Sequence, residues 1–174
     1  MNFRSMMILA ACFGTCALHA QNGNPISAGT KQLYTMVKGD ILKTAAKVPE
    51  SLYSFKPTPE VRSFAELFGH IADSQYEFCG PVKGETKKSD IEHTKKTKAD
   101  LTAALNEAFA YCDAAYNSMT DAAAGDKIQG FGPQGNKLFA LNFNTAHANE
   151  HYGNLVTYMR LKGIVPPSSE SQGK

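Results

Sequence analysis

The stretch that decides the fold is residues 136–163, which read NKLFALNFNTAHANEHYGNLVTYMRLKG. Residues at helical spacing in this stretch share one side of a helix, and that side is apolar except at its polar centre; its members are Ala140, Phe143, His147, His151, Asn154 and Tyr158. Gly163 is a typical residue at the end of a helix, and Pro166-Pro167 cannot continue one. We therefore predict one long helix from about Asn136 to Lys162.

Two helices are expected in the first half of the chain. Residues 28–48 carry apolar side chains at helical spacing, and Pro49 ends that segment. The next helix opens with Ser63 and Glu66, which form a capping box because each satisfies a backbone N–H that the helix leaves free. Gly80-Pro81 is expected to end this second helix.

A third helix is expected to begin after Thr97, a suitable N-cap, with apolar residues at three- and four-residue steps. The lysine-rich residues 83–98 before it are interpreted as a solvated loop. Residues 125–135 are rich in glycine and are interpreted as a plain interhelical loop, with a lid over a functional site as the alternative. Four amphipathic helices with polar connectors predict an all-α four-helix bundle.

Residues 1–20 have the pattern of a secretory signal peptide. Arg4 supplies the positive charge, the apolar run from Met6 to Phe13 follows, and Leu18-His19-Ala20 offers a cleavage site. We therefore expect an exported protein, either periplasmic or extracellular. A lipid anchor at Cys12 is the less favoured alternative.

The expected domain plan has three parts: the signal peptide, a helical bundle over residues 21–167 and a disordered tail over residues 168–174. No segment after residue 20 approaches the roughly 18 continuous apolar residues that a membrane span requires. Removing residues 1–20 takes away one basic side chain, Arg4, and no acidic one, which leaves 17 basic and 16 acidic side chains. This balance gives no reason to expect a nucleic-acid partner. We expect a small-molecule substrate of unknown identity, and a homodimer.

Cys79 and Cys112 are the two cysteines that follow residue 20. In an oxidising compartment they could pair. Two buried, unpaired thiols are the alternative, because the sequence alone does not bring their Cα atoms within bridging distance. A mature chain of about 150 residues can bury a sizeable core without a disulfide.

His147 and His151 lie four residues apart, so a helix places both imidazoles on one face, one turn from each other. His70 lies in the second expected helix, where it can look into the bundle. Three neutral imidazoles around one divalent ion leave a fourth position for water or substrate, as in catalytic zinc sites. The alternative is that these histidines make hydrogen bonds at helix interfaces and hold no metal.

His147, Glu150 and His151 also match the inverted zinc-protease signature H-x-x-E-H, in which the glutamate is the general base. That class is built on larger α/β proteins with a third ligand far downstream. Only 23 residues follow His151, and no sheet is expected. The protease interpretation is therefore disfavoured, and Glu150 is expected to be a solvated residue or an outer neighbour of the site.

The chain resembles the DinB-like (DNA-damage-inducible) family of four-helix bundles over nearly all of the expected mature protein. The resemblance rests on FAELFGHIA at residues 64–72 and on His147-x-x-x-His151-x-Gly153-Asn154 in the last helix. In that family three histidines bind a divalent metal, usually zinc or nickel, and the matching positions are His70, His147 and His151. The family often has Gln where this chain has Asn154, so a contact from that position is shorter or absent.

The resemblance implies two kinds of activity and no DNA binding. Characterised members include thiol-dependent S-transferases and a maleylpyruvate isomerase, and many members have no assigned activity. We therefore expect a metal-dependent hydrolase or a thiol-dependent transferase, with zinc or nickel as the cofactor. Asn154, Tyr158 and Glu150 are candidates for contacts around the metal or with the substrate. A non-enzymatic metal-binding bundle and a purely structural bundle are the alternatives.

Overall fold

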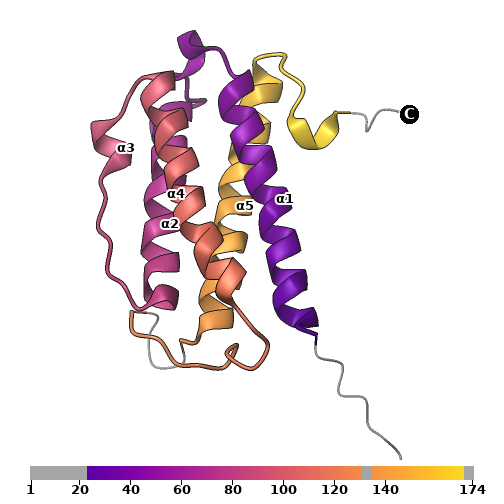
Figure 1. Ribbon diagram of the computed structural model, residues 1–174. Helices are drawn as coiled ribbons and strands as arrows, with labels where there is room; N and C mark the ends of the chain where they lie inside the picture. The colour runs from indigo at the N-terminus through magenta and orange to yellow at the C-terminus, as the bar shows by residue number, and fades with distance from the viewer. Residues whose placement is uncertain (1–22, 131–134, 171–174) are drawn as a thin grey trace, which may run out of the picture.

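The structure is a computed structural model that describes residues 23–130 and 135–170. Within these residues it contains four long helices and no strand, which confirms the predicted all-α bundle (Figure 1). The long helices are α1 (Pro25–Lys47), α2 (Phe64–Lys83), α4 (Lys98–Ser118) and α5 (Lys137–Leu161). The signal peptide expected over residues 1–20 lies outside the described residues.

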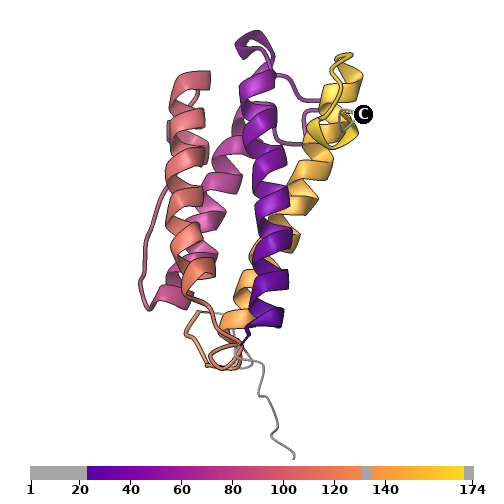
Figure 2. The same ribbon diagram turned by 45° about the vertical axis from the view of Figure 1, so that its right-hand side comes forward.

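The four long helices pack side by side around one apolar core. α2 packs against α4 and α5, and α1 packs against the same two helices from the opposite side (Figures 1 and 2). α1 and α5 run in one direction and α2 and α4 in the other, so the chain must cross the length of the bundle between α2 and α4 (Figure 1). The largest fully buried apolar side chains come from all four helices: Ile41, Phe64, Leu67, Phe68, Ile71, Leu101, Leu105, Phe109, Leu141, Leu155 and Met159.

The N-terminus of α2 agrees with the sequence and its C-terminus does not. Ser63 and Glu66 form the predicted capping box, with the Ser63 N–H 2.7 Å from a Glu66 carboxylate oxygen. The helix continues through Pro81 to Lys83, three residues beyond the expected end, and Gly84 ends it in the left-handed conformation (φ 74°). A proline in the last turn removes one hydrogen bond to the carbonyl of an exposed residue, which water can replace, so the cost is small.

The crossover between α2 and α4 is more ordered than the solvated loop that its lysines suggested. It contains a one-turn helix, α3 (Ile91–Thr94), that packs on α2. Asp73 of α2 accepts hydrogen bonds from the backbone N–H groups of Ile91 and Glu92, both at 2.9 Å. At Gly69 the two backbones approach so closely that a Cβ would lie 2.5 Å from the Cα of Glu92.

The chain after α5 also differs from the expected disordered tail. Residues Pro167–Ser169 form a short 3-10 turn, η2, that contacts α1. The Tyr152 hydroxyl of α5 bonds with Ser168, donating to its Oγ (2.9 Å) and accepting from its N–H (3.0 Å). Lys47 of α1 pairs with Glu170 at 2.6 Å. These partners lie far away in the sequence, and residues 171–174 lie outside the described residues.

Cys79 of α2 and Cys112 of α4 form a disulfide, which settles the alternative that the sequence left open. Their Cα atoms are 5.3 Å apart, and both residues are fully buried. The bridge therefore ties α2 to α4 through the core. No described helix is long and apolar enough to cross a membrane.

Candidate metal centre

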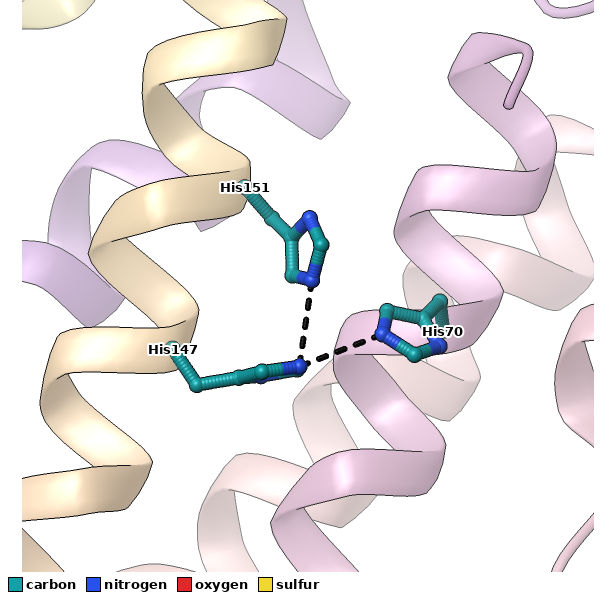
Figure 3. Close-up of side chains that lie close together, drawn as sticks. All are labelled: His70, His147 and His151. Carbon is teal, nitrogen blue, oxygen red and sulfur yellow. Dashed lines mark hydrogen bonds between the residues drawn. The ribbon is translucent and has the colours of Figure 1, made fainter. Parts of the chain in front are cut away.

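The three histidines named from the sequence meet between α2 and α5. His70 comes from α2, and His147 and His151 come from successive turns of α5 (Figure 3). The Nε2 atom of His147 lies 3.2 Å from that of His70 and 3.1 Å from that of His151. One ring nitrogen from each residue lies within 4.8 Å of the other two, so the group can hold a metal ion.

These distances suit a shared cation better than a set of hydrogen bonds. The Nε2 atom of His147 faces two other nitrogens, but a neutral imidazole nitrogen has only one proton or one lone pair to offer. A tetrahedral ion with nitrogen ligands at about 2.05 Å would hold neighbouring ligand nitrogens about 3.3 Å apart. Both observed Nε2–Nε2 distances lie close to that value.

Both imidazoles of α5 are in the protonation state that a metal site requires. The Nδ1 atoms of His147 and His151 are buried and make no hydrogen bond within the described residues. Burial lowers the pKa of His147 to about 4 and that of His151 to about 3, and neighbouring histidines and the Arg62 charge add to the shift. Both imidazoles are therefore neutral near pH 7, which is the form that binds metal.

The remaining ring nitrogen of His70 has a carboxylate partner that the sequence did not reveal. Its Nδ1 lies 3.1 Å from an oxygen of Glu92, a residue of α3. The other Glu92 oxygen accepts from Arg62 Nε at 2.8 Å. A carboxylate on the far nitrogen of a ligand histidine fixes the ring orientation and raises its basicity. The docking of α3 through Gly69 and Asp73 thus places Glu92 behind His70.

A cavity of about 600 Å³ adjoins His151, and the segment before α2, the start of α2, α3 and α5 line it. His151 and three residues considered from the sequence line it: Glu150, Asn154 and Tyr158. Glu150 and Asn154 are exposed, whereas Tyr158 is buried and its hydroxyl donates to the backbone oxygen of Arg62 at 2.9 Å. No described contact joins Glu150 to a histidine nitrogen, so the structure gives it no hydrogen-bonded role at the site.

The face of α5 that the sequence predicted to be buried is only partly the face that packs on the core. Phe143 is 43% exposed and Asn154 is exposed, whereas Ala148 and Leu155 are buried. His147 therefore lies at the edge of the buried face, where its ring contacts the rings of Phe143 and Phe78.

The described part of the loop at 125–135 does not approach the histidines. Its residues 127–130 line a different cavity, of about 1000 Å³, with residues 81–89 at the opposite end of α2. This placement agrees with a plain interhelical loop. Residues 131–134 lie outside the described residues.

Comparison with known proteins identifies the family. A family model described as the DinB superfamily matches residues 33–155. A DinB-like protein from Bacillus cereus ATCC 10987 superposes with a TM-score of 0.70 at 16% identity, covering 80% of this chain and 95% of that protein. A DinB-like protein from Bacillus subtilis gives 0.65 at 22% identity, covering 86% and 100%. No curated protein matches the chain. The family model spans most of the sequence, and the chain therefore belongs to the DinB superfamily.

Proposed function

We propose that His70, His147 and His151 together bind one divalent metal ion, zinc or nickel. The observation that carries this proposal is the meeting of three imidazole nitrogens, in which the Nε2 atom of His147 faces two others at 3.1 and 3.2 Å but can share a hydrogen bond with only one of them. Neutral imidazoles are good ligands for both metals, and their geometry does not decide between them. Glu92 would hold the His70 ring in the orientation that binding requires.

The chemistry that we propose is metal-dependent hydrolysis or transfer to or from a thiol. A bound ion of this kind lowers the pKa of a coordinated water or thiol into the physiological range. Support for a reaction, as distinct from storage of the metal, comes from the adjoining cavity, which gives a small molecule room beside His151. The walls of this cavity offer charged groups for orientation, among them Arg62 and Glu150.

We also propose that the protein works outside the cytoplasm. The Cys79–Cys112 disulfide supports this, because such bonds persist in oxidising compartments and are rare in reducing ones. The signal-peptide pattern of residues 1–20 predicts the same location. Sequencing the N-terminus of the protein recovered from its native compartment would test both points, with Gln21 as the expected first residue. The homodimer stays a prediction.

Metal analysis of protein purified without an affinity tag tests the central proposal. We expect about one zinc or nickel ion per chain after equilibration with the metal and removal of excess. A content below about 0.2 ion per chain after the same treatment would exclude a functional three-histidine site. Metal binding with no turnover of esters, amides or thiol substrates would instead favour the non-enzymatic metal-binding bundle.

A further inference from the structure

Arg62 shares the cavity beside His151 and is bonded to two other elements. It directly precedes Ser63, the N-cap of α2. Its backbone oxygen accepts from the Tyr158 hydroxyl of α5 at 2.9 Å, and its Nε donates to Glu92 of α3 at 2.8 Å. Three elements therefore restrain this residue, although its side chain is 42% exposed. A side chain that is already oriented loses little conformational entropy when it binds a ligand.

The guanidinium of Arg62 has unused donors on the wall of the cavity. Nε is engaged by Glu92, and the two Nη atoms make no hydrogen bond to any residue of the described ranges 23–130 and 135–170. Arg62 lines the same cavity as His151, so one small molecule can contact both. A guanidinium offers two parallel N–H groups, a geometry that matches the two oxygens of a carboxylate.

The acidic residues of this cavity limit the charge of a suitable ligand. Four glutamates and two cations line it: Glu60, Glu66, Glu92, Glu150, Lys56 and Arg62. Glu66 is engaged in the capping box, and Glu92 by Arg62 and His70. Glu60 and Glu150 remain as exposed carboxylates on its wall. Their charge opposes polyanions such as phosphates more strongly than a monoanion, so a single carboxylate is the better match to the Arg62 guanidinium.

We propose that Arg62 determines specificity by binding the carboxylate of a small organic acid whose other end reaches the three histidines. This inference rests on the proposed metal site and goes further by naming the substrate class. Glu92 then has two roles at once, because its two oxygens orient the His70 ring and the Arg62 guanidinium. Arg62 acts on ligand affinity, and the histidines act on the metal.

A matched pair of ligands separates the role of Arg62 in carboxylate binding from the role of the histidines in metal binding. Cobalt-loaded protein is titrated with 3-mercaptopropionate and with 3-mercaptopropanol, which carry the same thiol and differ in the carboxylate. Binding is followed by the thiolate-to-cobalt absorption band, a readout independent of turnover. The longer pair, 4-mercaptobutyrate and 4-mercaptobutanol, allows for a wider gap between the cobalt and Arg62. We expect at least one of the acids to bind about 10- to 100-fold more tightly than its alcohol, the range for a charge-assisted hydrogen-bonded pair.

The variants Arg62→Gln and Lys56→Gln provide the test and its control. Both remove one positive charge from the same cavity, but only Arg62 is bonded to Glu92, the carboxylate that contacts His70. Arg62→Gln should reduce the acid-to-alcohol preference to about onefold and leave the cobalt content unchanged, whereas Lys56→Gln should keep the preference within about twofold of wild type. Arg62→Lys, which retains the charge without the fork of donors, should keep only part of the preference.

The outcomes distinguish the two proposals. Wild-type protein that binds no cobalt would overturn the proposed metal site. Cobalt-loaded wild-type protein that binds each acid and its alcohol equally would overturn the inference about Arg62 alone, even if the Arg62 variants fail to fold. Equal loss of preference in Arg62→Gln and Lys56→Gln would also overturn it, because a diffuse charge effect would then be sufficient.

Discussion

Two polar groups interrupt the same interface between α2 and α5, and they are satisfied in different ways. In the first, Asn144 donates to Gln75 at 3.0 Å and to the Tyr116 hydroxyl at 3.1 Å, beside the buried Cys112. In the second, His70, His147 and His151 direct ring nitrogens at one another. We call the first group the amide layer and the second the histidine site.

This difference indicates that the amide layer is structural and that the histidine site binds a ligand. The amide layer pairs donors with acceptors and leaves a single buried side-chain atom, Asn144 Oδ1, without a partner within the described residues. The histidine site brings the Nε2 atom of His147 within 3.2 Å of two other imidazole nitrogens, although it has one proton or one lone pair to share between them. Buried polar groups are usually hydrogen-bonded, so the histidine site is the arrangement that needs something more.

The largest difference between the two groups is expected when a histidine is removed. His147→Ala should weaken metal binding by at least about 1,000-fold, or about 4 kcal/mol, because it removes the central ligand of the three. Zinc affinity measured against a competing chelator checks this. As the control, Asn144→Ala should leave the metal affinity within about threefold and reduce the free energy of unfolding by about 1–3 kcal/mol. Full metal affinity in His147→Ala would mean that the histidine site is structural as well.

The disulfide beside the amide layer should have the next largest effect, and it should act on stability only. Replacing Cys79 and Cys112 by alanine opens a loop of 33 residues and should lower the free energy of unfolding by about 3–4 kcal/mol. Urea denaturation of the metal-free protein measures this loss. Zinc affinity should not change, and a parallel loss of metal binding would show that the two groups are not independent.

Glu92→Gln should weaken metal binding by about 10- to 100-fold, the range for residues that support a metal ligand from behind. The glutamine still accepts from His70 but carries no charge to raise the basicity of the ring. Glu150→Gln is the matched control, since Glu150 is exposed and makes no described hydrogen bond to a histidine. Equal effects in the two variants would assign the loss to general electrostatics and not to the Glu92–His70 contact.

The last effect concerns pH, and it acts on the stability of the metal-free protein alone. His147 and His151 have folded pKa values of about 4 and about 3, below the ordinary value of 6.5. At a pH between the folded and the unfolded pKa values, the unfolded chain binds more protons than the folded one. The free energy of unfolding of metal-free protein should therefore fall as the pH drops from about 6.5 to about 3, and this contribution is fully present above pH 6.5. Thermal denaturation across this range should show a weaker pH dependence in a variant that lacks both histidines.

Much of this molecule could be predicted from local sequence. The capping box at Ser63, the N-cap at Thr97 and the left-handed Gly163 after α5 match the structure because each depends on residues within one helical turn. His147 and His151 could be named as a pair for the same reason, since helical spacing relates them. Their meeting with His70 required packing between helices, which the resemblance to a known family supplied.

Glu92 could not be predicted, because it lies 22 residues from His70 within a run of lysines. Its place depends on Gly69, where the absent side chain lets α3 approach, and on Asp73, which binds the first N–H groups of that turn. Neither residue carries a local signal for this contact. Arg62 is similar, because Tyr158 and Glu92 orient it from distant elements.

The sequence by itself determined the helices, their main caps and the identity of the imidazoles, because these follow from spacing along one chain. The tertiary structure alone decided that Cys79 and Cys112 pair, that Glu92 stands behind His70 and that Arg62 shares a cavity with His151. The physical reason is that these relations join separate elements. Their geometry is fixed by how closely the helices pack, and no local pattern records that distance.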